Sequence, residues 1–122
     1  MMAIRMGSVQ LRIMRVLWRE GEATARAVSE ALTAEGPIAH STVQTLLRKL
    51  EAKGAVGHER RERTFVFRAL VAENEVSRSA AQELLDRVFQ GSVSGLVAHL
   101  LENEEVSPDE MRRLRALVEE KP

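Results

Sequence analysis

Polar and cationic side chains recur along residues 40–49 at the spacing of one helical face. They comprise hydroxyls, one amide, one imidazole and two cations, and no acid follows before Glu51. Such groups can hydrogen-bond the base edges and phosphates of duplex DNA. The expected contacts are His40 at a phosphate and Ser41, Thr42, Gln44, Thr45, Arg48 and Lys49 along the groove. The alternative is a solvated surface helix, and this stretch alone leaves both interpretations open.

The apolar residues between these positions predict the helix that would carry them. Val43, Leu46, Leu47 and Leu50 stand at offsets of 0, 3, 4 and 7, which is one stripe of a helix. Its start is expected to be capped by His40 or Ser41. Gly54 is expected to end it. The polar set would then lie opposite the buried stripe.

A short basic hairpin is predicted directly after this helix. Residues 55–60 and 63–68 alternate as two strands around Arg61-Glu62. Neither turn residue is the glycine or asparagine that a tight hairpin prefers, so a longer or less ordered tip is expected. Phe65 and Phe67 share the face expected to pack against the helices. The cations expected to contact the DNA backbone or minor groove are Arg60, Arg61 and Arg63.

Two further helices are predicted before residue 40. The first runs from a cap at Ser8 to about Glu20 and is ended by Gly21, and the second is capped by Thr24. The order of three helices and two strands is that of a winged helix-turn-helix, in which the third helix enters the major groove. We therefore predict a mainly α fold, with a winged-helix DNA-binding domain over residues 1–72.

Residues 73–122 show three more helical patterns, with caps expected at Ser92 and Ser107 after a linker at Leu70–Asn74. About 50 residues with one aromatic can hardly bury such wide apolar stripes alone. We therefore predict a helical dimerisation domain that pairs with its own copy; the alternative is that these helices fold back on the first domain. The residues expected at the dimer contact are Leu84, Leu85, Val88, Val93, Leu96, Val97, Leu100, Leu101, Leu114 and Leu117.

The formal net charge of zero hides an asymmetry along the 122 residues. Residues 1–70 contain 12 Lys/Arg and 7 Asp/Glu, whereas residues 71–122 contain 6 Lys/Arg and 11 Asp/Glu. Residues 39–68 alone hold seven cations against three acids. A basic front half favours a polyanionic partner, and a protein-interaction module without a DNA role would not need it.

The sequence shows no arrangement of residues that is typical of catalysis or metal binding. The chain has no cysteine, which excludes thiolate sites and fits a reducing cytoplasm. His40, His58 and His99 fall in different predicted elements and lack metal-ligand spacing. No signal peptide is visible, and no apolar run approaches the roughly 20 residues of a membrane span. We expect no enzyme activity, no cofactor, no metal and no membrane insertion.

With these patterns laid out, the chain resembles the penicillinase repressors, the BlaI/MecI-type winged-helix family. The resemblance covers roughly residues 8–119. Its marks are Leu17-Trp18, the run Ser41–Gly54, the strand Arg63–Arg68, and Gly91-Ser92 followed by residues 96–100. Copper-responsive relatives carry C-terminal cysteines, which this chain lacks.

The resemblance implies a cytoplasmic homodimeric repressor bound to a palindromic operator. It also implies a possible protease partner, because well-known members are cut in their C-terminal region on a signal from a membrane sensor-protease. The scissile pair there is Asn-Phe, and the matching positions here are His99 and Leu100. The family's wing often has a glycine where Glu62 stands.

Overall fold

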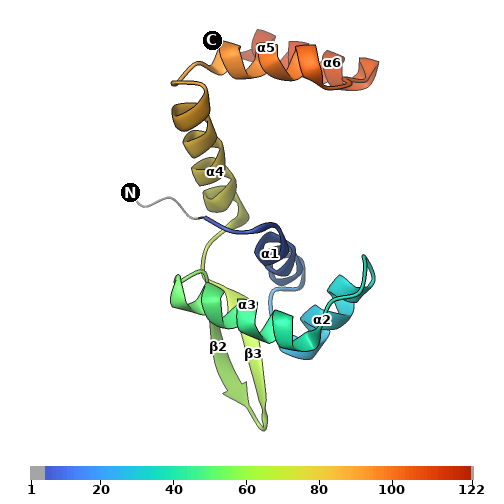
Figure 1. The fold of residues 1–122 in the computed structure, drawn as a ribbon, viewed down its shortest axis with the longest axis vertical. Helices are drawn as coiled ribbons and strands as arrows, with labels where there is room; N and C mark the ends of the chain where they lie inside the picture. Colours follow the sequence, from blue (N-terminus) through green and yellow to red (C-terminus); the bar gives the residue numbers. More distant parts are fainter. Residues whose placement is uncertain (1–4, 122) are drawn as a thin grey trace. The chain divides into compact units, whose positions relative to one another are not determined.

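The computed structural model describes residues 5–121, so the first four residues of the predicted N-terminal domain and Pro122 lie outside it. Figure 1 shows the chain as a ribbon. The chain comprises two compact units, residues 1–81 and residues 82–122. In chain order the elements are α1 (Ser8–Glu20), β1 (Ala23–Thr24), α2 (Ala25–Thr33), α3 (His40–Ala52), β2 (Val56–Arg61), β3 (Thr64–Ala69), α4 (Glu73–Val88), α5 (Val93–Asn103) and α6 (Pro108–Glu120).

The first unit has the predicted winged helix-turn-helix order. Helices α1, α2 and α3 are followed by the β2–β3 hairpin, which forms the wing and projects beyond α3 (Figure 1). Its core consists of side chains with almost no exposure, and it joins all three helices to the base of the wing. The largest of these are Ile13, Met14, Leu17, Val28, Leu32, Val43, Leu47, Leu50 and Val56. The predicted apolar stripe of α3 is thus confirmed, although Leu46 is only partly buried.

The helix ends follow the predicted chemistry in part. Gly21 ends α1 with a φ of 85°, and Thr24 Oγ1 accepts from the Ala27 N–H at 3.1 Å to cap α2. The prediction of Ser8 as the cap of α1 is wrong. Gly7 occupies the cap position, and its N–H donates to Gln10 Oε1 at 2.9 Å. The glutamine side chain thus supplies an acceptor for the backbone N–H at the start of the helix.

The predicted cap of α3 is also wrong. Ala39 stands at the cap position and makes no side-chain hydrogen bond, while His40 and Ser41 are already helical. At the other end, Gly54 has a φ of 80° and donates to the Glu51 carbonyl at 2.9 Å. Gly54 therefore ends the helix as predicted, because it takes the left-handed backbone at low cost.

The sheet contains a strand that the sequence did not predict. β1 pairs with β3, which also pairs with β2, so the antiparallel order is β1-β3-β2. The two long strands each begin one residue later than predicted. Their register places His58 opposite Phe67, whose side chain is in the core. Burial of Phe67 therefore fixes the register of the hairpin.

The wing tip is tighter than predicted. Arg61 pairs with Thr64, so only Glu62 and Arg63 form the turn. Glu62 has a φ of 58°, in the region that favours glycine. A glutamate thus holds a two-residue turn at a backbone position where a side chain costs conformational energy.

The second unit confirms two predicted helix caps. Ser92 Oγ accepts from the Gly95 N–H at 2.9 Å, and Ser107 Oγ accepts from the Glu110 N–H at 3.1 Å. Helix α4 begins at Glu73, so the last two residues of the predicted linker are helical. No side chain among residues 82–121 is fully buried in the single chain. These helices therefore expose apolar surface rather than closing a core of their own.

Candidate DNA-binding and self-association surfaces

The outer face of α3 is open to solvent along its whole length. All seven residues predicted from this helix are exposed, while Val43, Leu47 and Leu50 on the inner face are fully buried. The helix is therefore held by its apolar stripe, and its polar side chains remain available. The exposed set is His40, Ser41, Thr42, Gln44, Thr45, Arg48 and Lys49.

Two of these side chains already contact each other. Arg48 Nη2 donates to Thr45 Oγ1 at 3.4 Å, one turn apart on the helix. The guanidinium keeps its remaining donors for a bidentate contact, which suits the two acceptors of guanine in a major groove. The hydroxyl and guanidinium are thus presented together rather than as separate groups.

His40 is oriented by a buried serine of α2. Ser29 Oγ donates to the Ala25 carbonyl at 3.0 Å and lies 2.6 Å from His40 Nδ1. The hydroxyl and the ring nitrogen share one hydrogen bond, in which the imidazole tautomer decides the donor. His40 is therefore pinned through Nδ1, and Nε2 is left for a partner outside the described residues.

The three predicted wing arginines have different surroundings. Arg60 Nε donates to the Glu62 carbonyl at 3.3 Å, whereas Arg63 at the tip makes no ion pair or side-chain hydrogen bond within residues 5–121. Arg61 is fully engaged by two acids. It binds Glu22 through both terminal nitrogens and also pairs with Glu59. Of these three arginines, Arg60 and Arg63 therefore have no ion pair within residues 5–121, and we call them open cations.

The pair between Arg61 and Glu22 alters both ionisations. The hydrogen bond from Arg61 lowers the pKa of the Glu22 carboxyl below its ordinary value of 4.5, although some loss of hydration opposes this. The hydrogen bonds from Glu22 and Glu59 raise the pKa of the Arg61 guanidinium. Glu22 follows Gly21 at the end of α1, so this pair joins the wing to the first helix.

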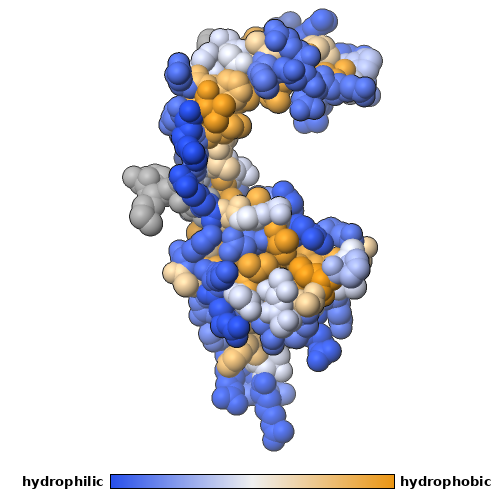
Figure 2. Space-filling view, in the orientation of Figure 1, coloured by the Kyte–Doolittle hydropathy of each residue, from blue (hydrophilic) through white to orange (hydrophobic). Residues whose placement is uncertain are grey.

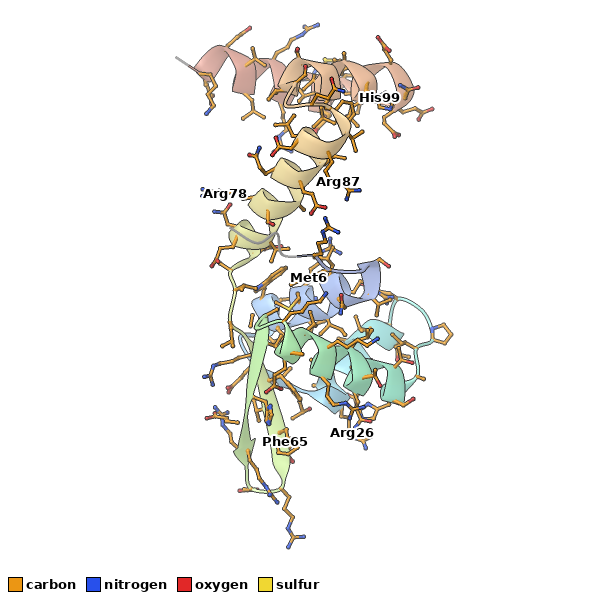
Figure 3. The ribbon with its side chains drawn as sticks, turned by 60° about the vertical axis from the view of Figure 1, so that its left-hand side comes forward. Met6, Arg26, Phe65, Arg78, Arg87 and His99 are labelled. Atoms are coloured by element: carbon orange, nitrogen blue, oxygen red, sulfur yellow. The ribbon has the colours of Figure 1, made fainter. Side chains whose placement is uncertain are left out.

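Two residues near this surface were not assigned to it from the sequence. Phe65 was expected to pack against the helices, but its side chain is 51% exposed because the wing projects past them. Arg26, in the first turn of α2, is also exposed (Figure 3). Its only signal in the sequence is a cation soon after the Thr24 cap, which is too common to single out.

The residues predicted for dimer contact form apolar surface on the second unit. Seven of the ten are exposed, with values from 38% at Val97 to 63% at Val93, and Leu85, Leu96 and Leu114 are partly buried. Hydrophobic side chains are visible at this surface in Figure 2. Exposed apolar area of this extent is unusual for an isolated unit. The seven exposed residues are Leu84, Val88, Val93, Val97, Leu100, Leu101 and Leu117.

The pair expected to correspond to the family's cleavage site lies within a helix. His99 and Leu100 are both exposed in α5. The His99 ring meets Phe89 edge to face at 5.8 Å, and the His99 carbonyl accepts from Asn103 Nδ2 at 2.8 Å. A protease that needs an extended chain would first have to unwind this turn.

Residues 5–121 offer neither a metal-binding cluster nor a membrane-spanning helix. No group of three His, Cys, Asp or Glu side chains there is placed to hold a metal ion. No helix in the same part of the chain is both long and apolar enough to cross a membrane.

Comparison with known proteins agrees with this geometry. Residues 6–120 match the model of the family described as penicillinase repressor. The chain is 27% identical over 116 residues to the penicillinase repressor of Bacillus licheniformis, covering 95% of this chain and 91% of the relative. It is 25% identical over 114 residues to the methicillin resistance regulatory protein MecI of Staphylococcus aureus strain N315, covering 93% of each.

A solved structure resembles part of the chain. The solution structure of the DNA-binding domain of the repressor BlaI superposes with a TM-score of 0.53 at 27% identity, covering 58% of this chain and 87% of that chain. Because the family model spans nearly the whole sequence, from residue 6 to the end of α6, the chain belongs to the penicillinase repressor family.

Proposed function

We propose that this DNA-binding transcription repressor acts as a homodimer that occupies a palindromic operator. Residues 1–72 bind DNA, with α3 in the major groove and the wing on the flanking backbone. Residues 73–122 form the dimer. Repression follows from occupancy, because a bound dimer blocks the promoter.

One observation supports this proposal above the others. The exposed face of α3 offers hydroxyls, an amide and two cations over a fully buried apolar face, and no acid lies within it. The open cations Arg60 and Arg63 stand on the adjoining wing. A polyanion with hydrogen-bonding edges is the partner that suits both parts.

The second unit supports the homodimer. Its exposed leucines and valines need a partner, and an identical copy would supply the same surface in a twofold arrangement. Two copies of α3 would then meet successive major grooves on one side of the duplex. Cleavage at His99-Leu100 would separate them, because it divides α5 within this apolar surface.

Selection of bound sites from random duplex DNA tests the proposal. The full-length protein should enrich an inverted repeat, and a promoter carrying that repeat should lose transcription in vitro when the protein is added. Failure to enrich any sequence over the starting pool would favour the alternative, a winged-helix protein-interaction module without direct DNA binding.

A further inference from the structure

One aromatic ring of the wing, that of Phe65, is exposed to solvent. Phe65 is in β3, and half of its side chain is open to solvent. A single exposed apolar residue is ordinary on a protein surface and needs no explanation by itself. The surroundings of this ring, however, place it on the surface proposed to meet DNA.

The pairing of the strands fixes which face of the wing carries the ring. Phe65 lies opposite Arg60, and Phe67 lies opposite His58. Directly opposed residues share a face of an antiparallel pair, as do residues two apart on one strand. His58, Arg60, Phe65 and Phe67 therefore form one face, which we call the α3-side face.

Contacts to α3 justify that name. His58 Nδ1 lies 2.7 Å from Glu51 Oε1 and 2.9 Å from Oε2, and Glu51 is in the last turn of α3. The His58 ring packs against Phe65 with centroids 4.8 Å apart. One chain of contacts thus runs from α3 through His58 to Phe65 and holds the ring beside the helix. Figure 3 shows Phe65 at the side of the wing strands.

The opposite face of the wing carries Arg61, whose charge is already balanced by Glu22. Its other exposed side chains, among them Thr64 and Arg68, are polar. The α3-side face, by contrast, carries the exposed Phe65 and the open cation Arg60 beyond its buried base at Phe67. Because this face also contacts α3 through His58 and Glu51, it is the face of the wing that a duplex engaged by α3 would meet.

We infer that Phe65 is a DNA contact whose ring packs against deoxyribose of the backbone flanking the groove that α3 enters. The phenyl ring has no hydrogen-bond donor or acceptor, so it can read neither base edges nor phosphates by hydrogen bonding. Sugar carbons are the apolar part of the backbone, so covering them removes apolar surface of both the ring and the sugar from water. The inference rests on the proposed DNA-binding function and adds a third type of contact to it.

The three contact types have distinguishable signatures. Loss of a base contact lowers affinity for the selected site more than for random DNA. Loss of a phosphate contact lowers the slope of log affinity against log salt by about 0.9. Loss of a sugar contact should do neither, because sugars carry no charge and are present at every position. It should reduce affinity by a similar factor on both duplexes.

The test uses full-length Phe65→Ala and Leu70→Ala, since Leu70 follows β3 and is 52% exposed, nearly the same as Phe65. The probes are the duplex that the wild-type protein selects and a random duplex of equal length. Phe65→Ala should weaken binding to both by about tenfold, from the apolar area left uncovered, with an unchanged salt slope. Leu70→Ala should bind both duplexes within about twofold of wild type. Wild-type-like binding by Phe65→Ala would overturn the inference.

Two further variants separate contact from wing stability. Phe65→Leu should recover most of the lost affinity, because it restores apolar area without the aromatic stacking. His58→Ala removes the stacking partner but keeps the phenyl ring, and it should cost less affinity than Phe65→Ala. Equal losses in His58→Ala and Phe65→Ala would show that the ring only stiffens the wing.

Failure of this inference can be told from failure of the proposed function. If the wild-type protein selects no duplex, the DNA-binding function itself is wrong. If it selects one and Phe65→Ala binds as tightly as wild type, only the role of Phe65 is wrong.

Discussion

Arg61 binds the carboxylate of Glu22 through both terminal guanidinium nitrogens, at 2.7 and 2.9 Å. The two residues are 39 positions apart, so the pair ties the outer part of the wing to the residue after Gly21. A bidentate contact of this kind fixes the relative orientation of the guanidinium and the carboxylate as well as their distance. Arg61 therefore helps to hold the wing against the end of α1, whereas Arg60 and Arg63 have no ion pair within residues 5–121.

Glu22→Gln should reduce stability in a way that depends on pH. The pKa of Glu22 is lowered in the folded protein, so its contribution is present above the ordinary carboxyl pKa and is lost as pH falls through the lowered value. Wild type should unfold at a higher temperature than Glu22→Gln near pH 7, and the two should converge well below pH 4.5. Thermal unfolding at several pH values measures this.

Glu30→Gln is the matched control, because Glu30 is an exposed acid of α2 that makes no ion pair with the described residues. It should match wild type at every pH. A difference for Glu22→Gln that stays constant down to pH 2 would mean that the carboxylate charge is not its source.

The wing arginines should differ in their effect on salt dependence. Arg63→Ala should lower the slope of log affinity against log salt by about 0.9, because an open cation at the wing tip neutralises a phosphate. Arg61→Ala should change the slope less, since its charge is already balanced by Glu22 and Glu59. Equal changes in slope for both variants would show that Arg61 leaves its acidic partners when the protein binds DNA.

Thr45→Ala and Arg48→Ala should each weaken binding to the selected site by about 1–3 kcal/mol and affect random DNA less. Both side chains are exposed opposite the buried leucines, so the fold should survive. Because Arg48 donates to Thr45, the double variant should cost less than the sum of the single ones.

Arg15→Ala is the control, since it removes an exposed cation of α1 that has no ion pair within residues 5–121. If Thr45→Ala and Arg48→Ala lose equal affinity for selected and random duplexes, these residues contact only the DNA backbone.

Glu62→Gly should stabilise the protein by about 0.5–1 kcal/mol. The φ of 58° costs a side-chain-bearing residue about 1–2 kcal/mol, and the greater unfolded-state entropy of glycine returns part of that. Denaturant unfolding measures the change. Arg63→Gly, at the neighbouring turn position without a positive φ, should destabilise instead. Stabilisation by both substitutions would contradict this account of the turn.

Leu100→Asp should give a monomer that keeps a folded first unit. Leu100 is 44% exposed on α5, and a carboxylate there would be buried without a partner in the proposed dimer. Sedimentation velocity measures the association state, and unfolding measures the integrity of the first unit. Leu70→Asp places the same charge on a comparably exposed leucine of the first unit and should remain a dimer. A dimeric Leu100→Asp protein would move the proposed interface elsewhere.

The parts of the fold that were predictable are those fixed by local pattern. The spacing of Val43, Leu47 and Leu50 was enough to predict a buried helix face. The positions of Ser92 and Ser107 predicted two helix starts. The polar face of α3 followed from the same periodicity. In each case the residues that decide the structure lie within two turns of one another.

The parts that were missed depend on contacts between distant segments. The two residues of β1 become a strand only because β3 lies beside them, and Gly7 is preferred over Ser8 because Gln10 folds back onto it. Phe65 and Phe67 alternate identically in sequence, but only Phe67 reaches the helices. No spacing rule could have linked Arg61 to Glu22.

The central claim is that two copies of the chain hold two half-sites of one operator. Sedimentation of the full-length protein on the duplex selected from random DNA tests it most directly, with a second duplex in which one half-site is scrambled. The account predicts two chains on the intact duplex, half-sites separated by about 10 base pairs or a multiple, and a large loss of affinity on scrambling. One chain on the intact duplex, with equal affinity for both duplexes, would contradict it.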